Sequence, residues 1–77
     1  MGTRWAEVTL HIDEETTHEE RENLRDRLLA RNGVFTASCR DERPHLMLIE
    51  YDPDIINSGE FLAEASRRGL HVELIGL

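Results

Sequence analysis

This chain has little cysteine and proline and no lysine: its 77 residues include one cysteine, two prolines, and nine basic residues that are all arginine. The single cysteine, Cys39, excludes an internal disulfide and any Cys-x-x-Cys motif. No apolar run has the length of a transmembrane helix, and the first residues lack the charged-then-apolar pattern of a signal peptide. We therefore expect one small cytoplasmic domain that spans 1–77.

The net charge of the chain argues against some classes of function. The formal net charge is -7, and 32% of the residues are charged. A surface of this sign disfavours binding to nucleic acid, whose phosphates need basic partners. The sequence also contains no Ser/His/Asp arrangement and no glycine-rich phosphate loop. Both observations favour a domain that is not an enzyme and binds no nucleic acid or membrane.

The hydrophobic pattern alternates between two periods along the chain. In 5–12, every second residue is apolar, which is typical of a half-buried strand. A longer segment with the apolar residues Leu24, Leu28 and Leu29 on one stripe predicts a helix from Thr17 to about Asn32. The remaining segments predict strands at 34–40, 45–51 and 70–75, with a turn at 41–44 and a short helix between Asn57 and Gly69.

Capping signals mark both helix starts. Thr17 followed by Glu20, and Asn57 followed by Glu60, each have the spacing of a capping box. Gly33 suits the left-handed position that ends a helix. Because Thr17 and Glu20 satisfy free N–H groups at a helix start, a purely structural function is sufficient to explain them.

The resulting order of elements is βαββαβ. With right-handed crossovers, this order predicts a ferredoxin-like α+β fold: a four-stranded antiparallel sheet with two helices on one face. The first strand should lie in the middle of the sheet, between the third and the fourth.

The chain resembles the heavy-metal-associated domains, the family of copper chaperones and of the small N-terminal domains of metal-transporting P-type ATPases. The resemblance covers nearly the whole chain, and four short segments carry it: 7–12, 32–34, 51–54 and 68–73. It implies a metal-binding Gly-Met-x-Cys-x-x-Cys loop before the first helix. Counting back from 33–34, the two cysteine positions fall on Thr17 and Glu20, and the Gly-Met positions fall on Glu14 and Glu15. Neither Thr nor Glu is a ligand for a soft metal, so we expect no thiolate site and no cofactor.

Histidines offer a different metal hypothesis. The predicted topology brings His11, His18, His45 and His71 to one edge of the sheet, beside the acidic loop. Imidazoles and carboxylates suit zinc, nickel or copper(II), and we take His11, His18 and His71 as the candidate ligands. The same cluster could respond to pH. The alternative is four solvated surface histidines.

The sheet face that no helix covers is the strongest functional indication. If Met47 and Ile49 point to the helices, neighbouring leucines on the same central strand point outward. Cys39 falls on the core side of its strand, where a lone thiol is more often a packing residue than a reactive one. An apolar group on an open face predicts an interface for a protein partner or a homodimer, although scattered surface hydrophobes are the alternative. Its members are Trp5, Leu46, Leu48 and Ile75. The leading hypothesis is thus a non-catalytic accessory or interaction domain, and the alternative is a binding module for a borderline metal.

Overall fold

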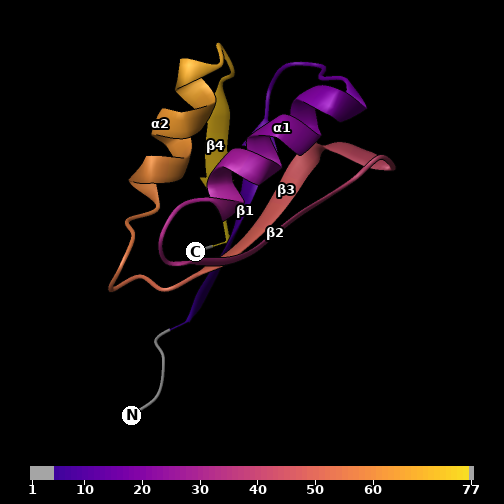
Figure 1. Ribbon diagram of the computed structural model, residues 1–77. Helices are drawn as coiled ribbons and strands as arrows, with labels where there is room; N and C mark the ends of the chain where they lie inside the picture. Colours follow the sequence, from indigo (N-terminus) through magenta and orange to yellow (C-terminus); the bar gives the residue numbers. More distant parts are fainter. Residues whose placement is uncertain (1–4, 77) are drawn as a thin grey trace.

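Two layers make up the computed structural model, which describes residues 5–76. One layer is a four-stranded antiparallel sheet in the order β2-β3-β1-β4, and the other is a pair of helices that covers one face of it (Figure 1). This is the predicted ferredoxin-like arrangement, with β1 between β3 and β4. The strands are β1 (Ala6–Ile12), β2 (Val34–Arg40), β3 (Arg43–Tyr51) and β4 (Val72–Ile75), and the helices are α1 (His18–Leu29) and α2 (Gly59–Arg67). No helix in this part of the chain is long and apolar enough to cross a membrane.

The core lies between the sheet and the helices. Alternate residues of β1 and β3 point into it, as their period of two requires. Tyr51 meets Phe61 of α2 edge to face, with ring centroids 5.0 Å apart. The fully buried large side chains are Val8, Leu10, Ile12, Leu24, Leu28, Met47, Ile49 and Phe61.

Helix α1 ends earlier than the sequence pattern suggests. Its last residue is Leu29, whereas the prediction extended it to about Asn32. The chain tightens there, because the N–H of Arg31 donates to the carbonyl of Leu28, three residues back. Gly33 then has a φ of +99°, and a Cβ at this position would lie 2.8 Å from the side chain of Ile55. Both the left-handed backbone and the close packing against Ile55 require glycine.

The buried face of α1 differs from the predicted leucine stripe. Leu24 and Leu28 are buried, but Leu29 is 40% exposed. The third buried residue of the helix is Arg21, which is 5% exposed. The buried apolar stripe of α1 therefore consists of only two leucines. The cationic side chain of Arg21 lies at the end of the helix nearest the acidic loop.

The predicted capping box at the second helix is wrong. The side chain of Asn57 accepts a hydrogen bond from the N–H of Gly59 at 2.6 Å, which is a local turn, and Ser58 is the residue that precedes the helix. Glu60 does not reach back to Asn57; its carboxylate pairs with Arg31 at 2.7 Å. A basic partner on the neighbouring helical segment thus takes the acid that a capping box would use. Leu62, on the same helix, is 36% exposed.

Two strand boundaries also differ from the prediction. β3 begins at Arg43, so the connection is the short turn at 41–42 instead of the four-residue turn 41–44. Pro44 is tolerated inside β3 because the β2–β3 register is irregular between Cys39 and Arg40. β4 begins at Val72 instead of residue 70.

Candidate functional site

The two positions where the resemblance predicts thiolates form a helix cap. The Thr17 hydroxyl accepts from the N–H of Glu20 at 3.1 Å, and the Glu20 carboxylate accepts from the N–H of Thr17 at 2.8 Å. The predicted capping box at the start of α1 is confirmed. Each side chain is committed to the backbone of the other residue, so the helix start is satisfied without a metal.

The buried side chain of Arg21 holds the same loop through hydrogen bonds. Its Nη1 donates to the carbonyl of Thr16 at 2.7 Å, and its Nη2 donates to the carboxylate of Asp41 at 2.9 Å. The Nε atom is buried without a partner among the described residues. The guanidinium therefore links the loop before α1 to the β2–β3 turn. A buried cation at this place would also repel a metal ion bound by the loop.

The four histidines reach the same end of the sheet, but they do not converge on one point. His18 bonds through Nδ1 to Asp41 at 2.8 Å, and His71 bonds through Nδ1 to Glu14. Hydrogen bonding to these carboxylates, followed by their charge, raises the pKa of His18 and of His71. His45 donates through Nδ1 to the carbonyl of Ile12 at 2.7 Å. The first two imidazoles thus each have a carboxylate partner of their own.

His11 has a different set of neighbours. It lies at the end of β1, directly across from Glu73 of β4, and its Nδ1 is 3.4 Å from the Asp13 carboxylate. One nitrogen or oxygen atom from each of these three residues lies within 4.8 Å of the others. The ring of His45 stacks on that of His11, with centroids 5.9 Å apart and an angle of 18°. Of the three candidate ligands, the structure places His11 in a possible metal-binding group, with Asp13 and Glu73 in place of His18 and His71.

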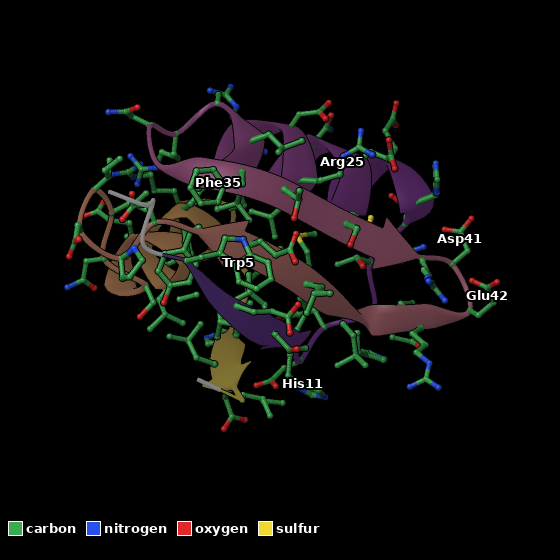
Figure 2. The ribbon with its side chains drawn as sticks, turned by 90° about the horizontal axis from the view of Figure 1, so that it is seen from below. Trp5, His11, Arg25, Phe35, Asp41 and Glu42 are labelled. Carbon is green, nitrogen blue, oxygen red and sulfur yellow. The ribbon has the colours of Figure 1, made fainter. Side chains whose placement is uncertain are left out.

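The face of the sheet opposite the helices carries the predicted apolar group. Trp5 is 63% exposed, Leu48 is 38% exposed and Ile75 is 48% exposed, while Leu46 is half-buried. Figure 2 shows this face, with the rings of Trp5 and Phe35 lying over it. The register puts Leu48 of β3 between Thr9 of β1 and Ser38 of β2, at the centre of the sheet.

A shallow groove of about 230 Å³ opens beside these leucines on the same face. Leu46 and Leu48 form its apolar floor, and Arg40 and Arg43 stand at one end of it. Cys39 also lines the groove, although its side chain packs against the core on the helix side, as predicted. Burial, followed by the charge of Glu22, raises the pKa of the Cys39 thiol, which lowers its thiolate fraction and its reactivity. The groove is thus suited to contact with an apolar side chain.

Solved structures share this architecture. A copper-binding domain from HMA7, a P-type ATPase, superimposes with a TM-score of 0.80 at 18% identity over 91% of this chain and 93% of that one. Oxidized MerP from Ralstonia metallidurans CH34 superimposes with a TM-score of 0.82 at 12% identity over 94% of this chain and 99% of that one. The chain has the heavy-metal-associated fold. No family model matches it, and no curated protein matches it.

The heavy-metal-associated fold brings together residues that the sequence pattern did not single out. Phe35, at 43% exposure, joins the apolar group because a register irregularity between Val34 and Thr36 places an extra residue in β2. Glu73 joins His11 because β1 and β4 pair in that register. The alternation of 70–75 places Glu73 on the outer face, so the sequence pattern could have indicated this residue. No local signal marks the bulge at Phe35.

Proposed function

We propose that this domain is a non-catalytic interaction module that binds a protein partner through the open face of its sheet. The observation that carries the proposal is the position of Leu48, which is exposed at the centre of a face that no helix covers. Exposed apolar side chains that gather at the centre of a surface are typical of interfaces. Leu46 lies near Leu48 on β3, and Trp5, Phe35 and Ile75 lie on the same face farther from its centre.

The loop before α1 supports the proposal by its chemistry. In place of two thiolates it has a helix cap between Thr17 and Glu20, and Arg21 beneath it is buried and bonded to Thr16. Neither arrangement leaves a soft ligand for copper(I). The chain has the fold without its soft-metal ligands. We therefore assign the binding function to the open face of the sheet. A cytoplasmic setting fits the lone unpaired cysteine.

Site-specific photo-crosslinking tests this function. A photoreactive residue replaces Ser38, which lines the groove beside Leu48, and a matched control carries it at the exposed Arg27 of α1. We expect a discrete protein adduct from position 38 in cells, none from position 27, and loss of the adduct when Leu48→Glu is added. Equal labelling from both positions, or an adduct that survives Leu48→Glu, contradicts the proposal.

A second candidate function is binding of a divalent metal such as zinc, and the group formed by His11, Asp13 and Glu73 favours it. Its ligand atoms lie within 4.8 Å of one another, whereas a tetrahedral zinc site needs about 3.4 Å between ligands at bond lengths of about 2.0–2.1 Å. Small side-chain rotations close this gap, because both carboxylates are exposed. One imidazole and two carboxylates are a donor set that zinc accepts, with water completing the shell.

Calorimetry with zinc on chelator-treated protein tests this second function. His11→Ala should abolish the binding, whereas His18→Ala, whose imidazole bonds to Asp41 away from the group, should leave it unchanged. Absence of heat at high micromolar zinc, or equal affinities in the two variants, excludes the site.

A further inference from the structure

The charged residues of the central strands are separated into two ends of the open face. Arg40 and Arg43 are partners across the β2–β3 turn and both line the groove. Glu7 and Glu50 are partners in the β1–β3 register at the other end, where β1 begins and β3 ends. Two glutamates directly opposite each other destabilise a sheet unless a cation approaches them. Along β2 and β3 the face is therefore basic at the groove and acidic at its far end, and Glu73 of β4 adds an acid beside His11.

These charges have no ion-pair partners within residues 5–76. Neither Arg40 nor Arg43 is salt-bridged there, and Glu50 accepts only the Thr36 hydroxyl at 2.6 Å. Elsewhere in the described chain, every arginine except the exposed Arg27 is paired with an acid, as Arg31 is with Glu60 at 2.7 Å. The other arginines in such pairs are Arg21, Arg25, Arg67 and Arg68. The open face thus carries charges of both signs that have no ion-pair partner in this part of the chain, beside the apolar group.

We propose that the occupant of this face is a second copy of the chain, stacked face to face with its strands antiparallel to those of the first. This inference rests on the proposed function and names its partner. A two-fold axis that runs across the strands near Leu46 and Leu48 places Leu46 on Leu48 of the second copy, and the reverse. The same rotation brings the end of β3 that carries Arg43 over the end of β3 that carries Glu50 in the other copy. Such an interface is self-complementary, as two-fold symmetry requires.

The aromatic residues fit the same arrangement. Figure 2 shows Trp5 and Phe35 toward one end of the sheet, with the Asp41–Glu42 turn at the other. An antiparallel stack therefore brings the arginines of one copy over the exposed rings of its neighbour. Arginine stacks favourably on aromatic faces. A stack with parallel strands would instead place Arg43 over Arg43 and Glu50 over Glu50, which costs energy at both ends.

The size of the face determines the strength of the pairing. Four strands about 4.8 Å apart and about seven residues at 3.4 Å per residue give a face of roughly 450 Å² on each copy. Two such faces bury less than the total of roughly 1,200 Å² that marks the lower limit of stable complexes. The dimer should therefore be weak and reversible, and it should dissociate further as salt screens its ion pairs.

A charge-reversal cycle tests the arrangement, with sedimentation equilibrium of the full chain as the readout. Arg43→Glu and Glu50→Arg should each weaken the dimer by about tenfold or more, because each puts like charges over one another. The double variant R43E/E50R restores opposite charges at both contacts and should recover the wild-type affinity to within a few-fold. Arg27→Glu on α1, where the side chain is exposed, is the matched control and should change nothing.

Three outcomes overturn the inference. A wild-type chain that stays monomeric at millimolar concentration excludes a second copy. A dimer strengthened by Arg43→Glu alone indicates parallel strands. A double variant no better than the single ones removes the Arg43–Glu50 contact. In each case an adduct from position 38 to a different protein would leave the proposed function standing, whereas absence of any adduct would remove both.

Discussion

Thr17 and Glu20 bond to each other's backbone, at 3.1 and 2.8 Å, in the two positions where the family resemblance predicts cysteines. At these positions the chain has a helix cap. A cap of this kind contributes about 1 kcal/mol to stability, which a chain of this size cannot readily lose. These two residues therefore stabilise the fold without metal.

Restoring the thiolates should restore the chemistry. The double variant T17C/E20C recreates the Cys-x-x-Cys spacing at the start of α1, and we expect it to bind copper(I) tightly, while the wild-type chain shows no tight site. Competition with a colorimetric copper(I) chelator measures both proteins. Equal competition by wild type and variant would show that residues 17 and 20 do not lie where the resemblance places them.

Arg21 should be the most costly arginine to replace. Arg21→Met keeps the aliphatic stem and removes the charge, leaving the Thr16 carbonyl and Asp41 without their donor. We expect a loss of about 2 kcal/mol in the free energy of unfolding, as for hydrogen bonds to charged groups. Arg25→Met, whose partners Glu22 and Asp26 lie on the surface of α1, should cost about 0.5 kcal/mol. Urea denaturation compares the two, and similar losses would argue against a special position for Arg21.

Alanine substitutions at Gly33 and Gly69 distinguish the cost of backbone strain from the cost of a steric clash. Both have positive φ, +99° and +76°, but a Cβ at Gly33 would lie 2.8 Å from Ile55, while one at Gly69 meets nothing within 4 Å. Gly69→Ala should therefore lose about 1 kcal/mol from backbone strain alone, and Gly33→Ala should lose clearly more. Thermal denaturation measures the difference between the two variants. A Gly33→Ala protein as stable as Gly69→Ala would mean that Ile55 moves aside without cost.

Stability should fall as the pH rises through neutrality. Hydrogen bonds to Glu14 and Asp41 raise the pKa of His71 and His18 above the ordinary value of 6.5. The resulting stabilisation is fully present below that unfolded value and is lost as the pH passes the raised pKa of the folded state. Between about pH 6 and 8 the wild-type chain should lose stability, whereas H18Q/H71Q should change less. Urea midpoints across this range measure the slope, and parallel slopes would contradict the assignment.

Stability should also fall as the pH drops into the acid range, because two carboxylates have lowered pKa values. The pKa of Glu14 is lowered, chiefly by its hydrogen bond with His71, and that of Asp41 is lowered, chiefly by its bond with His18. Their stabilisation is present above the unfolded values and is lost as the pH falls through the lowered ones. Glu14→Gln and Asp41→Asn should therefore make the chain less sensitive to acid, which the same denaturation series shows.

Local patterns in the sequence were sufficient for the architecture. The alternation of 5–12 predicts β1, and the Thr17–Glu20 spacing predicts a cap that the structure confirms. The order of elements, with right-handed crossovers, predicts the sheet order. Each of these features depends on neighbours within a few residues or on a general rule of chain topology.

The candidate sites depend on contacts that no local pattern contains. Arg21 is buried because Asp41, twenty residues away, comes to meet it across the turn. His18 and His71 are separated because each finds a different carboxylate in space, while His11 meets Glu73 only through the β1–β4 register. The outer residues of β3 were predictable from alternation, but Phe35 was not, because a bulge changes the phase of β2.

Sedimentation equilibrium of the wild-type chain and of Leu48→Glu is the most direct test of the claim that the open face of the sheet is a binding surface. If the open face binds a second copy, the average mass of the wild type rises with concentration toward that of a dimer, and Leu48→Glu stays monomeric throughout. A monomer at every concentration in both proteins, together with no adduct from position 38 in cells, would contradict the assignment of function to this face.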